Sequence, residues 1–454
     1  MIRMSLSEAA ALLRSAGIRI AGEPPPDREF LGVGIDSRTT LPRALFVALK
    51  GARFDAHDFI DEAADRKAAA ALVERDLPGS RLPLLRVGDS LQALGVLASA
   101  WRDRFHDIKM VAITGSNGKT TVKEMVAAIF REVGPVCSTR GNFNNEIGVP
   151  LTLCSLSEGQ RMAVLELGAN HPGEIAALTR LVRPTVGVIT QCAPAHLEGF
   201  GSLDAVARAK GELIEGLPDD AVAVINADDA YARQWRERAA HRRCLSFGTG
   251  NDADIRVRHA DSGFIALDTP SGRIELTLAL EGVHNALNAA AATAVAIACR
   301  IAAGEIRRGL ASMRPVAGRL ERKTGVFGER IIDDSYNANP TSLNAGIEVL
   351  AARSGMRWLV LGDMAELGPD AARMHFEAGL FARERGIDRL LAIGDFGRET
   401  VRAFGAGGEH FPDRQSLIRN LRRTLPPEAT VLIKGSRSMG MERVVRALVE
   451  GGGD

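Results

Sequence analysis

The sequence predicts an α/β fold of three domains, the middle one built on a doubly wound, mostly parallel sheet. Three observations predict it. The chain of 454 residues is about three domains long. Strand-like and helix-like patterns alternate from residue 109 to about residue 300, which is typical of a parallel sheet. The alternation begins again after a boundary at Pro315 to Arg319, so we expect domains over residues 1–86, 87–316 and 317–454.

Charge and composition argue against several classes of partner. The formal net charge is +1, from 57 basic and 56 acidic residues, which gives no electrostatic argument for nucleic acid or a membrane surface. The five cysteines are scattered without a CxxC motif, as in proteins of a reducing compartment. Because no apolar run reaches about 18 residues and no signal-peptide pattern opens the chain, we expect a cytoplasmic protein without membrane insertion.

In the amino-terminal region, short strand-like and helix-like stretches alternate. Ser5 and Glu8 have the spacing of a capping box, which predicts a helix directly after them. Beyond it, hydrophobic patterning predicts strands around residues 33–35, 45–49 and 84–87, and helices over residues 60–74 and 91–105.

Two polar segments follow the first two of these strands, Asp36-Ser37-Arg38 and Lys50-Gly51-Ala52-Arg53. Convergent donors of this kind would suit a diphosphate group. Solvated loops have the same composition, so the sequence leaves both interpretations open.

The strongest motif lies in residues 109–131. An apolar run, Met110 to Ile113, predicts a buried strand, and a helical pattern begins at Val122. The segment between them is Thr114-Gly115-Ser116-Asn117-Gly118-Lys119-Thr120-Thr121. Its glycines let backbone N–H groups wrap an anion, which predicts a phosphate-binding loop (P-loop). In such a loop the lysine reaches the β- and γ-phosphates and the next hydroxyl binds Mg²⁺, although the usual spacing asks for glycine where this chain has Ile113.

Two other predicted strands lead into residues that suit the same site. The strand over residues 163–167 carries Glu166 at its end, and the strand over 185–190 is followed by a loop with His196. Ligands bind beyond the carboxyl ends of strands in open α/β sheets, so we expect these residues to meet the glycine loop. Glu166 is a candidate Mg²⁺ ligand. A lone loop histidine is more often structural, so the role of His196 stays open.

The predicted helix over residues 202–217 places Lys210 on its apolar face, with Leu203, Val206, Leu213, Ile214 and Leu217. A buried, unpaired amine has a lowered pKa and is nucleophilic. It can combine with CO₂ to form a carbamate, which is an oxygen ligand for a metal. The alternative is that the flexible stem carries the charge out to water.

The rest of the chain offers further candidate binding residues. Asn285, near the start of an apolar helix, would either contact a base or cap the helix. In the last domain, candidate binding loops follow predicted strands at residues 333–340, 362–368 and 434–440. No GxGxxG motif follows a strand there, which argues against dinucleotide binding.

Along nearly its whole length the chain resembles the Mur ligase family of peptidoglycan synthesis. The glycine loop of that family also lacks the first glycine, which accounts for Ile113. The matching segments are TGSNGKTT at 114–121, GNFNNEIGVP at 141–150, ELGANHPGEI at 166–175, the His196 loop, AKGE at 209–212, HNALNA at 284–289, Gly318-Arg319, DDSYNANP at 333–340, LGDMAELG at 361–368 and KGSRSMGMERV at 434–444.

The resemblance implies roles at the nucleotide. Lys119 and Thr120 would serve the triphosphate and its Mg²⁺, within a loop completed by Gly115, Ser116, Asn117, Gly118 and Thr121. Glu166 would bind one Mg²⁺, and His196 with carbamylated Lys210 would hold a second. The remaining contacts would be Asn285 at adenine, Arg319 at the γ-phosphate, Asp334 at the ribose and Asn337 near the base.

The resemblance also implies two peptide substrates and a monomeric enzyme. Residues Ser37, Arg38, Lys50, Gly51, Ala52 and Arg53 would hold the UDP end of the acceptor, with Asn144 and Asn145 at its sugar-peptide portion. Lys434 and Arg437 would meet the carboxylate of the incoming dipeptide. The activity implied is ATP-dependent joining of D-alanyl-D-alanine to UDP-N-acetylmuramoyl-tripeptide (UDP-MurNAc-tripeptide) through an acyl phosphate.

Two other functions remain to be separated from this one. The ligase that adds the third amino acid to UDP-MurNAc-dipeptide usually carries an Asp-Asn-Pro-Arg motif, which this sequence lacks. The second alternative is a nucleotide-binding relative that has lost catalysis. Joint retention of Lys119, Glu166, His196, Lys210 and Arg319 argues against it.

Overall fold

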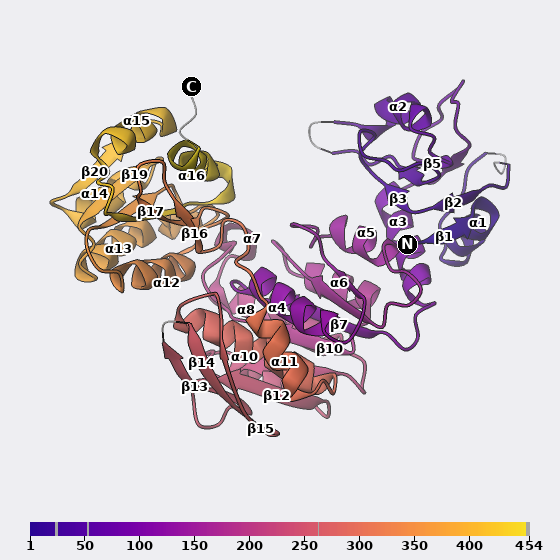
Figure 1. Cartoon of the computed structure of the whole chain (residues 1–454). Helices are drawn as coiled ribbons and strands as arrows, with labels where there is room; N and C mark the ends of the chain where they lie inside the picture. The colour runs from indigo at the N-terminus through magenta and orange to yellow at the C-terminus, as the bar shows by residue number, and fades with distance from the viewer. Residues whose placement is uncertain (23–25, 52–53, 262, 451–454) are drawn as a thin grey trace.

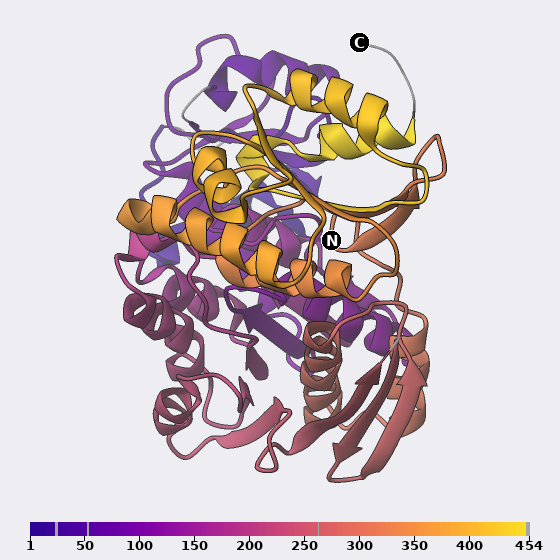
Figure 2. The same ribbon diagram turned by 90° about the vertical axis from the view of Figure 1, so that its left-hand side faces the viewer.

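The computed structural model describes residues 1–22, 26–51, 54–261 and 263–450. Figure 1 shows three lobes, with the amino-terminal and carboxy-terminal lobes resting on different sides of the central one. In Figure 2 the carboxy-terminal lobe, in orange and yellow, lies toward the viewer. The mostly parallel sheets in three domains confirm the predicted fold class. The residue numbers of the domain boundaries stay a prediction.

The amino-terminal domain holds two small sheets. Ser5 caps α1 by accepting the backbone N–H of Glu8, as the capping-box spacing predicts. Strands β1 and β2 pair antiparallel, and the other four strands form a parallel sheet in the order β3-β4-β5-β6. The elements are β1 (Arg3–Ser5), α1 (Leu6–Ser15), β2 (Glu29–Leu31), β3 (Val33–Gly34), β4 (Leu45–Val47), η1 (Ala56–Phe59), α2 (Ile60–Asp65), β5 (Ala70–Val73) and β6 (Leu84–Arg86).

The prediction of one helix over residues 60–74 is wrong. Helix α2 ends at Asp65, and the chain turns through Lys67, whose φ is 62°, before it enters β5. All four residues of β5 are buried. A strand buried on both faces reads as a continuous apolar run, which periodicity does not distinguish from a buried helix.

The central domain is built on a nine-stranded sheet in the order β15-β14-β13-β12-β11-β10-β7-β9-β8. Its strands pair in parallel except for the antiparallel pairs β13–β14 and β14–β15. The elements are α3 (Ser90–Arg102), β7 (Lys109–Thr114), α4 (Lys119–Arg131), β8 (Val136–Ser138), α5 (Gly148–Cys154), β9 (Met162–Glu166), α6 (Glu174–Val182), β10 (Val186–Ile189), α7 (Leu197–Phe200), α8 (Leu203–Glu215), β11 (Val222–Asn226), α9 (Ala232–Ala239), β12 (Arg243–Gly248), β13 (Ile255–Asp261), β14 (Phe264–Thr269), β15 (Gly272–Thr277), α10 (Val283–Ala298) and α11 (Ala303–Ala311).

Strand β7 separates two hydrophobic cores. Val111 and Ile113 pack with α4 and α10, whereas Met110 and Ala112 pack with α5, α6 and α8. This division results from the strand geometry, since successive side chains point to opposite faces of a sheet. The core that contains Met110 and Ala112 continues into the amino-terminal domain, because Phe30 of that domain belongs to it. The two domains are therefore joined by apolar packing.

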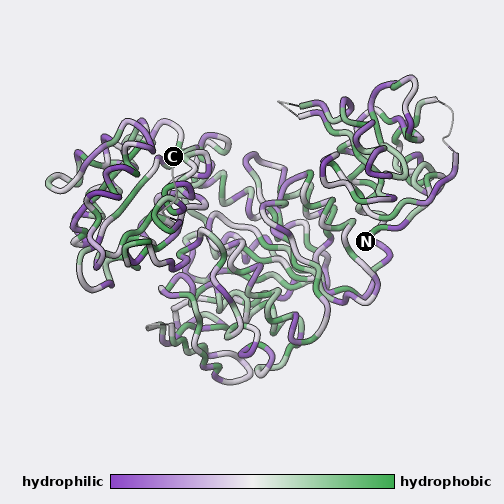
Figure 3. Tube along the Cα trace, turned by 45° about the horizontal axis from the view of Figure 1, so that its top comes forward, coloured by the Kyte–Doolittle hydropathy of each residue, from purple (hydrophilic) through white to green (hydrophobic). Residues whose placement is uncertain are grey.

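The carboxy-terminal domain has a six-stranded sheet in the order β16-β17-β21-β18-β19-β20, parallel except for β16. In Figure 3 the hydrophobic segments, in green, run through the interior of each lobe. The elements are β16 (Glu321–Thr324), β17 (Arg330–Asp334), α12 (Pro340–Ala351), β18 (Arg357–Leu361), η2 (Gly368–Asp370), α13 (Ala371–Glu384), β19 (Arg389–Ile393), α14 (Gly397–Phe404), β20 (Gly408–Phe411), α15 (Arg414–Thr424), β21 (Thr430–Lys434), η3 (Arg437–Met439) and α16 (Glu442–Val449). Across the four ranges that the structure describes, no helix combines the length and the apolar character needed to cross a bilayer.

The contact between α11 and α4 gives a stability prediction. A Cβ on Gly309 would stand 2.4 Å from Ile129 Cα, so Gly309→Ala must push two backbones apart. We expect a loss of about 1–3 kcal/mol in the free energy of unfolding, measured by calorimetry. In the control Gly304→Ala, on the same helix, the nearest atom is the mobile Arg308 Nη1 at 3.5 Å. That variant should gain about 0.5 kcal/mol; equal losses in both variants would contradict the packing argument.

Candidate functional site

Two glycines fix the shape of the loop between β7 and α4. Gly115 has φ 145°, and a Cβ there would stand 2.0 Å from Thr190 Oγ1. Gly118 caps α4 with φ 82°, and a Cβ there would stand 2.5 Å from Asn288 Oδ1. Only glycine fits at either position. The backbone N–H groups of the loop and the start of α4 therefore form the anion-binding cradle that the sequence predicts.

Three neighbouring strands bring Lys119, Glu166 and His196 together. Strands β10, β7 and β9 are adjacent and parallel. Glu166 ends β9, the glycine loop follows β7, and His196 lies in the loop after β10. All of these line one cavity of about 890 Å³, together with Arg319, Asp334 and Asn285, whereas Lys210 on α8 is not among the residues that line it. The predicted convergence of strand ends is confirmed.

Glu166 is a buried carboxylate at the centre of the hydrogen bonds around the glycine loop. Its carboxylate is only 3% exposed and accepts hydrogen bonds on both oxygens. The Thr120 hydroxyl donates to Oε2 at 2.8 Å, and Asn144 Nδ2 donates to Oε1 at 2.8 Å. Arg319 Nη2 in turn donates to Thr120 Oγ1 at 3.0 Å. The carboxylate therefore links the glycine loop, the 141–150 segment and, through Thr120, an arginine that follows the central domain.

Hard oxygen donors at this point suit Mg²⁺. The Thr120 hydroxyl and the Glu166 carboxylate lie 2.8 Å apart beside the phosphate-binding loop. Mg²⁺ usually takes one or two carboxylates and completes its shell with phosphate oxygens and water. Among the described residues there is no cluster of three or more His, Cys, Asp or Glu that could hold a metal alone. Such an ion would therefore depend on nucleotide oxygens for much of its shell.

Two buried donor atoms at the cavity have no hydrogen-bond acceptor in the described part of the chain. Asn117 Nδ2 and Arg319 Nε are buried and make no hydrogen bond to any residue that the structure describes. Lys119 Nζ donates to the carbonyl of Gly115 at 2.7 Å. Desolvation lowers the pKa of Lys119 and the nearby Arg319 adds to this, while Glu166 opposes it. These cationic and amide donors all suit a phosphate-bearing ligand.

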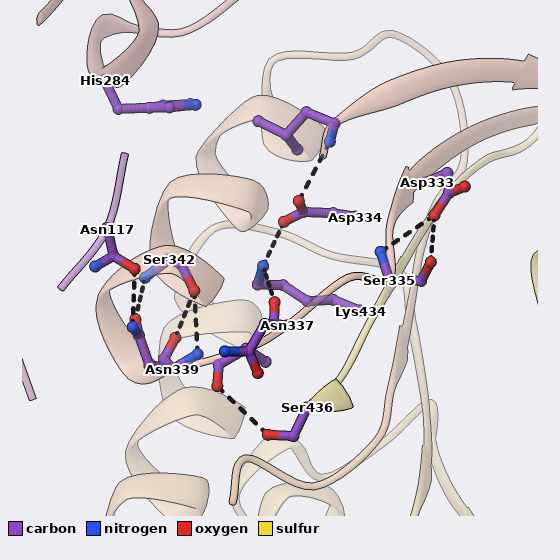
Figure 4. Close-up of polar contacts among 12 residues, drawn as sticks. Asn117, His284, Asp333, Asp334, Ser335, Asn337, Asn339, Ser342, Lys434 and Ser436 are labelled. Carbon is purple, nitrogen blue, oxygen red and sulfur yellow. Dashed lines mark hydrogen bonds and ion pairs between the residues drawn. The ribbon is translucent and has the colours of Figure 1, made fainter. Parts of the chain in front are cut away.

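Asp334 and Lys434 form a buried ion pair on the carboxy-terminal side of the cavity (Figure 4). Lys434 Nζ lies 2.5 Å from Asp334 Oδ2 and also donates to the carbonyl of Asn337 at 2.9 Å. Burial raises the pKa of Asp334, and Lys434 opposes that shift. His284 lies on the opposite side of the view, and desolvation followed by repulsion from Lys434 lowers its pKa to about 4. The imidazole is therefore neutral at pH 7.

Asn285 is not the cap of its helix. Gly282 occupies the N-cap of α10, and Asn285 Nδ2 donates to the carbonyl of Glu281 at 2.8 Å. The capping alternative is therefore wrong. The side chain lines the cavity beside Asn288, which is compatible with the base-contact alternative.

Lys210 is buried in α8 as its place on the apolar stripe predicts. It is 2% exposed, so the alternative in which its stem reaches water is wrong. Its ammonium lies 5.5 Å from the centre of the Phe200 ring, and no hydrogen bond or ion pair reaches it from the described residues. Desolvation, reinforced by Lys119, lowers its pKa to about 7. A large fraction of the side chain is therefore a neutral amine at neutral pH.

His196 makes a contact that joins two domains. It adopts a left-handed backbone conformation with φ 55°, and its Nδ1 contacts Glu366 Oε2 in the carboxy-terminal domain. The Glu198 N–H also donates to the carbonyl of Glu366 at 3.2 Å. Desolvation lowers the pKa of His196, and Glu366 opposes that shift. The loop after β10 is therefore attached to the loop after β18.

Comparison with known proteins identifies the family. Residues 113–296 match the Mur ligase middle domain, residues 318–437 match the Mur ligase glutamate ligase domain, and residues 29–102 match the catalytic domain of the Mur ligase family. The chain is 44% identical to the UDP-N-acetylmuramoyl-tripeptide–D-alanyl-D-alanine ligase of Escherichia coli (strain K12), over 92% of this chain and 94% of that protein. The chain belongs to the Mur ligase family.

Solved Mur ligase structures have the same architecture. A crystal structure of MurF from Acinetobacter baumannii matches with a TM-score of 0.90 at 33% identity, covering 97% of this chain and 98% of that one. The MurF ligase of Thermotoga maritima in complex with ADP matches with a TM-score of 0.81 at 30% identity, covering 92% and 96%. The arrangement of three domains is thus shared with experimental structures.

The predicted UDP-binding segments of this Mur ligase lie apart from the cavity. The Ser37 hydroxyl is buried and donates to Glu62 Oε2 at 2.7 Å. Arg38 is 82% exposed and pairs with Asp36 at 2.8 Å. Lys50 and Gly51 are exposed, whereas Ala52 and Arg53 lie outside the described residues. None of the described members lines the cavity of about 890 Å³.

The cavity between the central and carboxy-terminal domains is also lined by two predicted binding residues, Asn145 and Arg437, and by residues that were not predicted. Asn145 Oδ1 accepts the N–H of Gly148, the first residue of α5, at 3.0 Å, while Arg437 lies at the cavity beside Tyr336. Tyr336, whose ring centre lies 4.3 Å from Arg319 Cζ, is not predicted from the sequence as a site residue. Neither are His284, Asn339 and Glu366, although each falls inside a motif that carries the family resemblance. Proximity to those motifs was the available signal.

The buried amine of this Mur ligase predicts a pH-dependent stability difference. The folded-state pKa of Lys210 is about 7, against 10.5 for an ordinary lysine. Below pH 7 the folded protein carries a buried ammonium at full cost, and this cost disappears as the pH rises toward 10.5. Lys210→Met should therefore be more stable than the parent by on the order of 4 kcal/mol at pH 6.5 and by only about 1 kcal/mol at pH 9.5.

Urea unfolding at both pH values in CO₂-free buffer measures this difference. Lys109→Met, at an exposed position on β7, is the control and should show no such trend. An equal gain in stability for Lys210→Met at both pH values would mean that titration of the Lys210 amine does not cause the pH dependence.

Proposed function

We propose that this Mur ligase joins D-alanyl-D-alanine to UDP-MurNAc-tripeptide, with ATP cleaved to ADP and phosphate, and so makes the UDP-MurNAc-pentapeptide precursor of peptidoglycan. One observation carries the proposal: the chain is 44% identical to a ligase of that name over 92% of its own length. The cavity supports it, because a phosphate-binding loop, a buried carboxylate and donors from two domains surround one space.

ATP binds across the boundary of the central and carboxy-terminal domains. Its phosphates lie on the loop of Gly115, Ser116, Asn117, Gly118 and Thr121, where Lys119 and Arg319 neutralise their charge. Asn285 contacts the adenine, Asp334 accepts from a ribose hydroxyl, and Asn337 lies near the base. Lys434 holds Asp334 at 2.5 Å, so its role in this assignment is to position the ribose acceptor.

Two Mg²⁺ ions complete the site. Thr120 and Glu166 would hold one, and His196 with the carbamate of Lys210 would hold the other. Bound Mg²⁺ neutralises charge on the transferring phosphoryl group. The carbamate is expected of the buried amine, whose pKa of about 7 leaves it free to attack CO₂ with loss of one proton. It replaces a costly buried cation by an oxygen ligand.

The reaction then proceeds in two steps. The terminal carboxylate of the tripeptide attacks the γ-phosphorus of ATP in line, the bond to ADP breaks, and an acyl phosphate forms. Lys119 and Arg319 stabilise the charge that spreads over the transferring oxygens. The amine of the dipeptide next attacks the acyl carbon, loses a proton and expels phosphate. Acyl phosphates react with water, so the enclosing loops of two domains also serve to exclude it.

The acceptor extends from the cavity toward the amino-terminal domain. Asn144 and Asn145 hold its sugar-peptide portion, and Asn144 does so from its hydrogen bond to Glu166 at 2.8 Å. Ser37, Arg38 and the segment 50–53 hold the UDP end. We place the protein in the cytoplasm. It works as a monomer, because the proposed site is made within one chain.

Phosphate release and product mass test the proposed reaction. Release from Mg-ATP should require both UDP-MurNAc-tripeptide and D-alanyl-D-alanine, and mass spectrometry should find UDP-MurNAc-pentapeptide. Omission of either substrate is the control. Release that instead requires UDP-MurNAc-dipeptide and a single amino acid would assign the chain to the preceding ligase, while absence of turnover with every acceptor would favour a non-catalytic nucleotide-binding protein.

The carbamate has its own test in Lys210→Ala. This variant should lose activity by about a hundred- to a thousandfold, because one charged ligand of the reacting centre is missing. Short carboxylic acids that fit the space of the side chain should restore part of the rate. Lys109→Ala is the matched control and should keep full activity. Full activity of Lys210→Ala without added acid would end the carbamate hypothesis.

A further inference from the structure

Two loops of the carboxy-terminal domain are joined edge to edge at the cavity. The loop after β18 and the loop after β21 share three hydrogen bonds. The Gly362 N–H donates to the carbonyl of Lys434 at 2.9 Å, and the Ser436 N–H donates to the carbonyl of Asp363 at 3.0 Å. The Ala365 N–H donates to Ser436 Oγ at 2.6 Å. Directly beyond this last link, one loop continues with Glu366 and the other with Arg437.

Glu366 and Arg437 are opposite charges that line the same cavity. Glu366 is 50% exposed, and its Oε2 contacts His196. Its Oε1 makes no hydrogen bond to any residue in the described part of the chain. Arg437 is 64% exposed, packs over Tyr336 at 5.5 Å, and has only a loose ion pair with Glu442 at 3.7 Å. Both charges are therefore available to a ligand.

The other carboxylates of the cavity are engaged or lie elsewhere. Both oxygens of Glu166 accept hydrogen bonds, and Asp334 is paired with Lys434. Glu174 accepts backbone N–H groups of the central domain at 2.8 and 3.3 Å. Glu146 belongs to the central-domain segment that the proposed function gives to the sugar-peptide acceptor. Among the described carboxylates that line the cavity, Glu366 is thus the one whose loop is hydrogen-bonded to the loop of Arg437, through the preceding residues Ala365 and Ser436.

We propose that Glu366 binds the ammonium group of the incoming dipeptide, whose terminal carboxylate the family resemblance already gives to Arg437. This inference rests on the proposed function and names residues that select the second substrate. A dipeptide spans roughly 7 Å from its ammonium to its carboxylate. That length suits Glu366 and Arg437, because each follows one of the two residues, Ala365 and Ser436, that join the loops. The ammonium must give up one proton, to Glu366 or to water, before its nitrogen can attack. The contact of Glu366 with His196 then places the resulting amine on the side of the cavity where His196 lies, next to the acyl carbon in the proposed reaction.

The same geometry gives the two arginines beside Tyr336 separate tasks. Arg319 Cζ lies 4.3 Å from the centre of the ring, and Arg319 donates to Thr120, so it serves the phosphate side. Arg437 Cζ lies 5.5 Å from the same centre, and Arg437 directly follows the loop residue Ser436 that is bonded to Ala365. Lys434 is 2% exposed and fully engaged with Asp334 and Asn337, so it is not available to a dipeptide carboxylate.

Kinetics of full-length variants with modified dipeptides test the assignment. Glu366→Gln should raise the KM for D-alanyl-D-alanine by about ten- to a hundredfold and leave the KM for ATP unchanged. N-acetyl-D-alanyl-D-alanine, which has no ammonium, should inhibit parent and variant equally. Arg437→Gln should abolish the preference of the parent for D-alanyl-D-alanine over its carboxy-terminal amide. Glu366→Asp should recover part of the lost affinity.

The control is Glu377→Gln on α13, a 55% exposed carboxylate paired with Arg373, which should behave like the parent. An unchanged KM for the dipeptide in Glu366→Gln would overturn the inference. So would a parallel rise in the KM for ATP, because Glu366 would then act through His196 on the nucleotide site. If the parent itself fails to make pentapeptide, the proposed function fails, whereas a normal parent with an unaffected Glu366→Gln contradicts this inference alone.

Discussion

The site depends on the burial of one negative charge. The Glu166 carboxylate is 3% exposed, and a carboxylate at that depth is costly unless both oxygens are satisfied. The donors come from two separate segments, Thr120 at the start of α4 and Asn144 in the loop before α5. Arg319 then bonds to Thr120 from beyond the central sheet. Satisfying this single group therefore fixes the phosphate loop, the acceptor segment and the approach of the next domain relative to one another.

Three buried lysines show how partners decide chemistry. Lys123 donates to the carbonyl of Thr139 at 2.9 Å and lies 2.5 Å from Glu124, and Lys434 is held by Asp334 and Asn337. Both ammonium groups have oxygen acceptors. Lys210 is as deeply buried, yet its ammonium makes no hydrogen bond or ion pair with the described residues and lies 5.5 Å from the centre of the Phe200 ring. Its pKa falls to about 7 for that reason.

Local patterns in the sequence predict much of the site, but they carry no information on contacts between distant segments. Adjacent parallel strands bring their ends together, so Glu166 and His196 could be placed beside the glycine loop, and helical periodicity was enough to bury Lys210. The contacts His196–Glu366 and Asn117–Asn339 join residues 170 and 222 positions apart. They depend on how two domains dock, for which spacing within either domain carries no signal. The failure at β5 has a different cause, since a fully buried strand has no polar face to reveal its period.

The two domain boundaries differ in kind, and this difference suits the chemistry. The amino-terminal domain shares a continuous apolar core with the central domain, which binds them firmly. Between the central and carboxy-terminal domains, Leu197 packs on the apolar core, and several polar contacts cross the boundary: Asn117–Asn339, Thr120–Arg319, His196–Glu366, and Glu281 with Arg322 and Arg353. Polar contacts exchange for water at small net cost. A boundary of this kind can separate to admit ATP and the dipeptide and re-form around an intermediate that water would destroy.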